Sequence, residues 1–176
     1  MKLIVVAGMP GAGKEEFLNV AIDMGLPFIR MGDLVRELYA KRSEEDRDLN
    51  LGQFANVERE RHGYNIWAKR ALERMSGSIY LIDGCRSMEE IKAFRGLSDD
   101  VNIVAIHAPP KVRYERLVKR QREDAPKNTE EFEARDTREI GWGLAEVVAL
   151  ADRLILNDGP LERFREDATA YLRSVA

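Results

Sequence analysis

The chain has 176 residues, 44% of them hydrophobic, which is enough for one sizeable core and too few for two ordinary domains. Its 28 basic and 31 acidic residues give a formal net charge of −3, so no overall basic field draws it to nucleic acid or anionic membranes. A single cysteine, Cys85, excludes an internal disulfide and a cysteine-rich metal cluster. No apolar run reaches the roughly 18 residues of a membrane-spanning helix, and we expect a soluble cytoplasmic protein.

Short apolar runs alternate with longer helical patterns, an order typical of βαβ units and a parallel sheet. The predicted strands are KLIVVA (2–7), PFIR (27–30), IYLID (79–83), VNIVAIH (101–107) and RLILN (153–157). The predicted helices cover about 13–24, 32–42, 51–75, 87–95, 110–123, 129–150 and 160–174. Ser87 with Glu90 has the spacing of a capping box, and Pro110 and Pro160 suit a first helical turn.

Polar and charged residues follow the predicted strands directly, and parallel α/β sheets bind ligands at this carboxyl edge. The first strand is followed by GMPGAGK (8–14), which also opens the first predicted helix. In that context backbone amides cradle phosphates and the lysine reaches the β and γ phosphates. The expected nucleotide contacts are Gly8, Met9, Pro10, Gly11, Ala12, Gly13, Lys14 and Glu15.

Glu15 stands where the phosphate-loop pattern has a serine or threonine for magnesium, and the next residue, Glu16, offers no hydroxyl either. Three interpretations stay open. The carboxylate of Glu15 points to solvent and complements the helix dipole, or it binds magnesium itself, or it repels the phosphates. We favour the first two, and the third predicts slow or absent turnover.

Asp33 and Arg36 lie three residues apart in MGDLVREL, at the start of a predicted helix. Arg36 is a candidate grip for an acceptor phosphate, and Asp33 can orient or deprotonate an acceptor hydroxyl. The alternative is an ordinary salt bridge in the first helical turn.

Asp83 and Arg86 end the third strand in IYLIDGCRS. A carboxylate beside the phosphate loop can hold magnesium through water, and Arg86 is a second candidate acceptor contact. The alternative is a plain Asp-Gly turn. Cys85 between them is expected to be a small buried residue.

Three arginines in PPKVRYERLVKRQRE share one helical face: Arg113, Arg116 and Arg120. Delivered by a closing lid, they would stabilise charge on a transferring phosphoryl group. The alternative is a solvated face balanced by Glu115 and Glu123. Arg135 and Arg138 are weaker candidates for the same role.

His62 and His107 have no metal-ligand partner at useful spacing, so both are expected to be structural or solvent-facing. Trp67 and Trp142 are expected to anchor the core, because aromatic side chains bury large areas.

The motifs GMPGAGK, MGDLVR and IDGCR resemble, in order and position, those of adenylate kinases. The tail ALADRLILNDGPLERF is similar to the nucleotide-base loop of dephospho-CoA kinases, which makes Asn157 a candidate nucleotide contact. Nearly the whole chain resembles an archaeal P-loop kinase-like family related to both, with VAIHAPPKVRYERLVKRQRED in its typical place.

The resemblance implies a three-layer α/β P-loop kinase fold, with a five-stranded parallel sheet between helices. It implies ATP and Mg²⁺ as ligands, Lys14 as the phosphate lysine, and Arg36 and Arg86 as acceptor-phosphate contacts. We expect one domain, 1–176. Its expected parts are a core of 1–31, 76–110 and 140–176, an acceptor-binding insertion of about 32–75, and a lid of about 111–139.

The predicted function is an ATP-binding small-molecule kinase, with a nucleoside monophosphate as the favoured acceptor. One alternative is a hydroxyl kinase resembling dephospho-CoA kinase, with Asp33 as general base. Another is a nucleotide-binding switch or assembly factor with slow or no turnover. The expected partners are a nucleotide and a small phosphorylated or hydroxyl acceptor, with no membrane and no nucleic acid as the main ligand. The expected catalytic residues are Lys14, Asp33, Asp83, Arg116 and Arg120.

Overall fold

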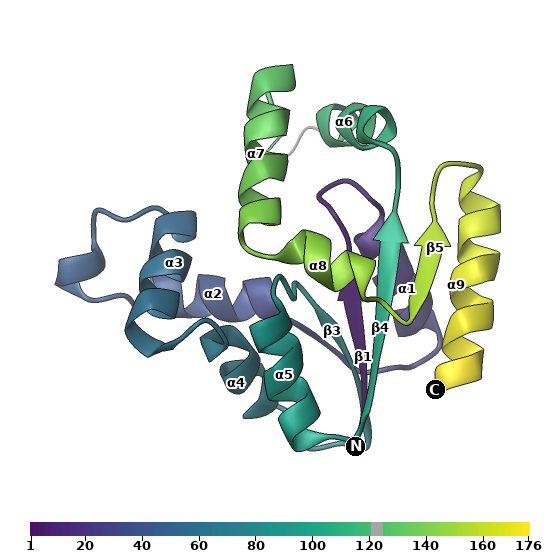
Figure 1. Ribbon diagram of the computed structural model, residues 1–176, viewed down its shortest axis with the longest axis horizontal. Coiled ribbons are helices and arrows are strands. Elements are labelled where there is room, and N and C mark those ends of the chain that lie inside the picture. Colours follow the sequence, from purple (N-terminus) through teal and green to yellow (C-terminus); the bar gives the residue numbers. More distant parts are fainter. Residues whose placement is uncertain (121–124) are drawn as a thin grey trace.

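A parallel sheet with helices on both faces forms the protein, in a computed structural model that describes residues 1–120 and 125–176 (Figure 1). In chain order the elements are β1 (Lys2–Ala7), α1 (Lys14–Asp23), β2 (Phe28–Arg30), α2 (Met31–Ala40), η1 (Glu44–Asp46), α3 (Leu51–His62), α4 (Ile66–Leu72), β3 (Ile79–Asp83), α5 (Met88–Leu97), β4 (Asp100–His107), α6 (Pro110–Lys119), α7 (Thr129–Gly141), α8 (Leu144–Ala149), β5 (Arg153–Leu156) and α9 (Leu161–Val175).

The five strands lie in the order β2-β3-β1-β4-β5, and every pair is parallel. The predicted strands and the α/β fold class are therefore confirmed. β1 is central, with Val5 opposite Ile82 of β3 and Ile103 of β4. Because the carboxyl ends of all strands meet at one edge, the loop after β1 lies between those after β3 and β4.

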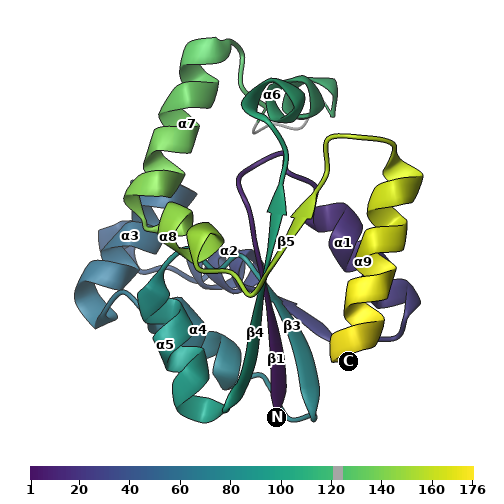
Figure 2. The ribbon, with the colours of Figure 1, turned by 45° about the vertical axis from the view of Figure 1, so that its right-hand side comes forward.

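Helices cover both faces of the sheet (Figure 2), and alternate residues of the inner strands β1, β3 and β4 enter two separate cores, one on each face. On one face Leu3 and Val5 pack among residues of α2, α3, α4, α5 and α8. On the other face Ile4 and Val6 pack against α1 and α9. Burial on both faces explains why β1 has a continuous apolar sequence.

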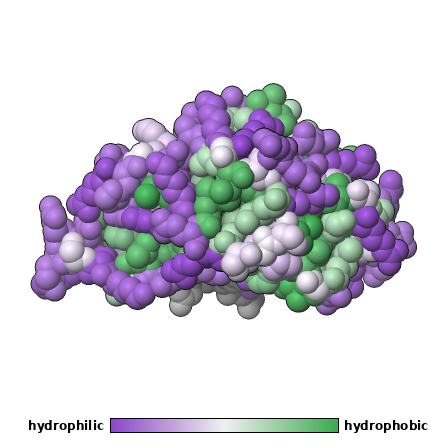
Figure 3. Space-filling model, turned by 90° about the horizontal axis from the view of Figure 1, so that it is seen from below, coloured by the Kyte–Doolittle hydropathy of each residue, from purple (hydrophilic) through white to green (hydrophobic). Residues whose placement is uncertain are grey.

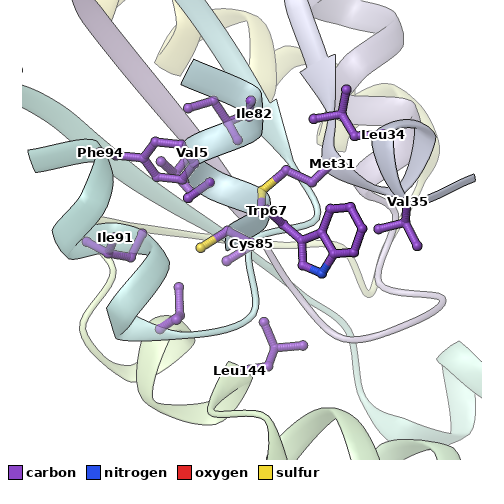
Figure 4. Packing of buried hydrophobic residues seen from close by; sticks show 14 of the residues in the cluster. Val5, Met31, Leu34, Val35, Trp67, Ile82, Cys85, Ile91, Phe94 and Leu144 are labelled. Atoms are coloured by element: carbon purple, nitrogen blue, oxygen red, sulfur yellow. The ribbon is translucent and has the colours of Figure 1, made fainter. Parts of the chain in front are cut away.

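Trp67 is the largest fully buried side chain of the first core, which confirms its predicted role as an anchor. It packs with Met31 and Cys85, as Figure 4 shows. Its Nε1 donates a hydrogen bond to the carbonyl oxygen of Ala55, so its polar atom is satisfied. Burial raises the pKa of the Cys85 thiol well above its usual value, which confirms Cys85 as a buried residue with little thiolate character.

Two predicted helices are each broken by a glycine. The predicted helix 51–75 ends at His62 and restarts at Ile66, because Gly63 has a φ of 95°. The predicted helix 129–150 divides into α7 and α8 at Gly143, whose φ is 102°. The last residues of the predicted helix 110–123, with Glu123 among them, lie outside the described residues, and α6 ends at Lys119.

Helix starts follow the sequence signals in part. Ser87 Oγ accepts from the backbone amide of Glu90, but the Glu90 carboxylate binds the amide of Arg86, so only half of a capping box forms. Pro110 begins α6 as predicted, whereas Pro160 is the residue before α9.

The face seen from below is mainly hydrophilic, with apolar side chains in separate patches (Figure 3). Within 1–120 and 125–176, no helix is long and apolar enough to cross a membrane.

Candidate functional site

A cavity of about 570 Å³ lies at the carboxyl edge of the sheet, a volume within the range of small-molecule sites. Its lining includes Gly8, Pro10, Gly11, Gly13, Lys14, Glu15, Arg30, Arg36, Asp83, Arg86, Arg116, Arg120, Arg135 and Glu139. Residues from the loops after β1 and β3, from the end of β2 and from α2, α6 and α7 therefore meet around one space. Among the predicted nucleotide contacts, Met9 and Ala12 do not line it.

The loop between β1 and α1 forms the phosphate-loop shape that its glycines predict. Gly8 has a φ of 151°, and a Cβ added there would lie 2.5 Å from the carbonyl oxygen of Ile106. Lys14 Nζ donates to the carbonyl oxygen of Gly8 at 2.6 Å. Burial lowers the pKa of Lys14, and the negative charges of Asp83 and Glu139 oppose that shift. The lysine is therefore held over its own loop among carboxylates.

Asn157 lies under this loop. Its Nδ2 donates to the carbonyl oxygen of Ala12 at 2.9 Å, and its Oδ1 accepts from Arg116 Nη2 at 3.2 Å. The side chain is buried and does not line the cavity. This geometry supports the phosphate loop and links it to α6, and the predicted nucleotide contact of Asn157 stays a prediction.

Replacing Gly13 with alanine tests this packing. The new Cβ would lie 2.0 Å from Asn157 Nδ2, and the φ of 110° is strained for any side chain. The backbone conformation alone is expected to cost about 1–3 kcal/mol of folding free energy, and distortion of the loop should abolish the ATP binding that its sequence predicts. Chemical denaturation and calorimetric titration with ATP measure both effects. Gly96→Ala, with no atom near the added Cβ, is the control: it should leave ATP affinity unchanged and should not lower stability, since alanine favours a helix by up to about 1 kcal/mol over glycine.

Glu15 and Glu16 occupy the first turn of α1, where carboxylates complement the helix dipole. Glu15 is exposed and lines the cavity, while Glu16 pairs with Arg165 Nε of α9 at 2.6 Å. The position of Glu15 is compatible with the dipole interpretation and with a place near bound phosphates.

Asp83 ends β3 beside the phosphate loop, and its Oδ1 is buried without a hydrogen-bond partner among the described residues. A buried, unsatisfied carboxylate oxygen is a strong acceptor for a hydrated cation. Asp83 therefore fits the predicted role of holding Mg²⁺ through water. In the described part of the chain, no group of three or more His, Cys, Asp or Glu side chains is placed to hold a metal ion.

Arg36 and Asp33 form an ion pair on the first turns of α2, and more than half of each side chain is exposed. Arg36 lines the cavity, whereas Asp33 does not. The salt bridge that the sequence offered as an alternative is thus present, and an exposed pair of this kind exchanges partners readily.

Arg86 donates from Nε to Glu139 Oε2 at 2.8 Å. Burial lowers the pKa of Arg86, but the carboxylates of Glu139, Glu90 and Asp83 together more than offset this, and the pKa is raised overall. Trp142 lies 5.1 Å from the Arg86 guanidinium, and Arg59 and Arg138 also lie over its ring. The prediction that Trp142 anchors the core is wrong, because this half-buried indole packs among guanidinium groups instead.

Arg113 does not share the cavity-facing side of α6 with Arg116 and Arg120, so that expectation is wrong. Its guanidinium is buried and binds Asp136 of α7 through two hydrogen bonds, one of them 2.9 Å long. It also donates to the carbonyl oxygen of Pro10 at 3.1 Å. Arg113 therefore ties the phosphate loop, α6 and α7 together.

Arg116, Arg120 and Arg135 do line the cavity, from α6 and α7. Arg30 and Glu139 line it as well and were not predicted as site residues. Arg30 is the last residue of β2, which is a usable signal, but no local pattern marks Glu139. His62 and His107 are exposed and lie outside the cavity, in agreement with their predicted roles.

Comparison with known proteins agrees with this geometry. The model of the AAA domain family matches residues 7–133. The UPF0200 protein of Thermoplasma volcanium is 44% identical, covering 97% of this chain and 96% of that protein. The UPF0200 protein of Hyperthermus butylicus is 42% identical, covering 97% and 92%.

Solved structures share the fold at low identity. A shikimate kinase from Bacteroides thetaiotaomicron is 19% identical with a TM-score of 0.62, covering 98% of this chain and 97% of that one. A gluconokinase from Sinorhizobium meliloti is 18% identical with a TM-score of 0.60, covering 99% and 93%. The chain belongs to the AAA domain family and to the UPF0200 proteins, and it has a P-loop kinase-like fold.

Proposed function

We propose that the protein is a phosphotransferase that moves the γ-phosphoryl group of ATP to a small acceptor, with a nucleoside monophosphate as the favoured acceptor. One observation carries the proposal: Arg36, Arg86 and Arg116 converge from three different elements on a cavity whose floor is the phosphate loop. A cavity with cations on several sides suits two phosphorylated molecules held end to end.

In this arrangement Lys14 and the loop amides bind the triphosphate, and Arg36 and Arg86 bind the acceptor phosphate. An acceptor oxygen attacks the γ-phosphorus while the bond to the oxygen bridging the β and γ phosphates breaks, so ADP leaves. Arg116 and Arg120 stabilise the charge that spreads over the transferring group. The protein contributes position and electrostatics and forms no covalent bond.

Asp83 would hold Mg²⁺ through water, and Glu15 is a second candidate for it. When bound, the cation neutralises charge on the β and γ phosphates. Asp83 also faces Lys14, whose charge it stabilises.

A hydroxyl acceptor is the second candidate, because two of the solved structures with this fold are a shikimate kinase and a gluconokinase. In that case Asp33 would leave Arg36 and take the proton of the acceptor hydroxyl as general base. A phosphate acceptor is already ionised and needs no such base.

The test is ADP release with ATP and Mg²⁺, scanned across nucleoside monophosphates, dephospho-CoA, shikimate and gluconate. Stimulation by a nucleoside monophosphate, with Asp33→Ala losing less than about tenfold, supports the proposal, since general base catalysis contributes 10²–10⁴-fold where it is used. A collapse of about 10²-fold or more in Asp33→Ala supports the hydroxyl acceptor.

Glu15→Ser belongs in the same experiment, because it restores the hydroxyl of the usual loop. If ATP binds, no acceptor stimulates ADP release, and Glu15→Ser restores hydrolysis, the phosphotransferase proposal is wrong. The chain would then act as a nucleotide-dependent switch.

A further inference from the structure

Glu139 is a buried carboxylate in a cavity otherwise rich in guanidinium groups. It lies on the last turns of α7, its side chain is 8% exposed, and it lines the cavity beside Arg86. Its Oε2 accepts the hydrogen bond from Arg86 Nε at 2.8 Å. The arginine that faces a prospective anion is thus already bound to an anion supplied by the chain.

The charge of Glu139 also reaches the phosphate loop. It opposes the effect of burial on the Lys14 ammonium, as Asp83 does, while Arg86 and Arg135 act in the other direction. Two carboxylates therefore balance the cations at the centre of the site. Because Asp83 is fixed on a strand and Glu139 is on a helix that ends two residues later, Glu139 is the carboxylate that can withdraw.

A ligand phosphate and the Glu139 carboxylate would compete for the same guanidinium. Both are anions that bind an arginine through its N–H groups, and two anions in one desolvated contact repel each other. An acceptor anion that binds the Nε side of Arg86 must then displace or neutralise Glu139, because Glu139 already occupies that donor. An apparent affinity is reduced by the fraction of molecules in which the binding group is free, as for any internal competitor.

We propose that Glu139 is a positioning residue that binds Arg86 in the ligand-free protein and releases it when the anionic group of the acceptor binds Arg86. Binding of the acceptor is thereby coupled to the carboxyl end of α7. This inference rests on the proposed function in one respect, that Arg86 receives the acceptor anion.

Trp142 would report the exchange. It is the residue directly after α7, and its ring lies 5.1 Å from the Arg86 guanidinium and 5.9 Å from that of Arg138. Gly143 follows it in a left-handed conformation and separates α7 from α8. A change at Arg86 and Glu139 therefore alters the charges around the Trp142 indole directly, and no rearrangement of the hydrophobic core is needed.

The test is calorimetric titration of the full chain with AMP, and separately with inorganic phosphate, in the absence of ATP. Glu139→Gln keeps the size and one acceptor oxygen but removes the competing charge. If Arg86 is free in about one molecule in ten, the variant should bind AMP about tenfold more tightly. Glu133→Gln removes the same charge from an exposed position of α7 outside the cavity and is the matched control, with less than about twofold change.

The coupling to Arg86 is tested by repeating Glu139→Gln in an Arg86→Gln background, where the gain in affinity should vanish. Fluorescence in a Trp67→Phe background isolates Trp142, since the chain has two tryptophans. In the Trp67→Phe protein that keeps Glu139, AMP should change the emission of Trp142. In the Trp67→Phe protein with Glu139→Gln, the emission should already resemble that of the AMP-bound state before AMP is added. The calorimetric arm needs no tryptophan replacement, so a poorly folded Trp67→Phe chain leaves it intact.

Equal or weaker AMP binding by Glu139→Gln, binding by neither protein, or a gain that persists without Arg86 would overturn the inference. These outcomes are distinct from failure of the proposed function. Acceptor-stimulated ADP release with unchanged AMP affinity in Glu139→Gln keeps the function and removes the inference. Tighter AMP binding by Glu139→Gln that depends on Arg86, without ADP release for any acceptor, keeps the inference and removes the proposed function.

Discussion

Lys14→Ala is expected to abolish acceptor-stimulated ADP release, with a fall of about 10²–10³-fold or more, the size seen when one preorganised donor to a reacting group is removed. Lys14 is the cation that the fold places over the loop, with Nζ 2.6 Å from the carbonyl oxygen of Gly8 and two carboxylates nearby. Its removal leaves Asp83 and Glu139 without that counter-charge, so ATP affinity should fall as well. Initial rates of ADP formation and calorimetric titration with ATP measure the two losses.

Lys119→Ala is the control for Lys14→Ala, because Lys119 is an exposed lysine of α6 that does not line the cavity. It should keep full ATP affinity and turnover. A Lys14→Ala protein that unfolds at the wild-type temperature yet forms ADP at the wild-type rate would contradict the assignment of the phosphate loop.

Arg113→Met is expected to destabilise the protein by about 3 kcal/mol, because it leaves the Asp136 carboxylate largely buried and unpaired. The carbonyl oxygens of Pro10 and Ala108 lose a donor at the same time. In a chain of this length such a loss lowers the melting temperature by about 6–12 °C. Thermal and chemical denaturation measure it.

Arg47→Ala breaks an ion pair with Glu44 in which both side chains are well exposed, and it should change stability by less than about 1 kcal/mol. A double variant, Arg113→Met with Asp136→Leu, separates packing from charge, and it should recover part of the loss because no unpaired charge remains. If the double variant loses more free energy of unfolding than the two single variants lose together, the ion pair is not the source of the effect.

The strands and the phosphate loop could be predicted because their signals are local. β1, β3 and β4 are nearly continuous apolar runs, and GMPGAGK stands between a strand and a helix. The two helix breaks were missed although Gly63 and Gly143 mark them, since a glycine within a helical pattern is tolerated elsewhere, as Gly96 shows inside α5. Only the positive φ at Gly63 and Gly143 distinguishes them.

The arginines of α6 show that helical spacing does not determine which side chains line the cavity. Arg113, Arg116 and Arg120 are all arginines at a spacing that predicts one helical face, yet Arg113 is buried while the other two line the cavity. What separates them is Asp136, which lies 23 residues away. Glu139 is 53 residues from Arg86, and its sequence surroundings are those of an ordinary charged helix. Such roles depend on contacts across the fold, which helical spacing does not encode.

The strand order also bears on how the chain folds as it is made. β1 leaves the ribosome first, but both of its neighbours come much later, since β3 begins at Ile79 and β4 ends at His107. Until then the most apolar strand has no partner on either edge, and pairing over such separations is slow. The phosphate loop that follows β1 therefore gains both neighbouring strands only after residue 107 has been made, and we expect a nascent chain of this protein to hold no nucleotide before that point.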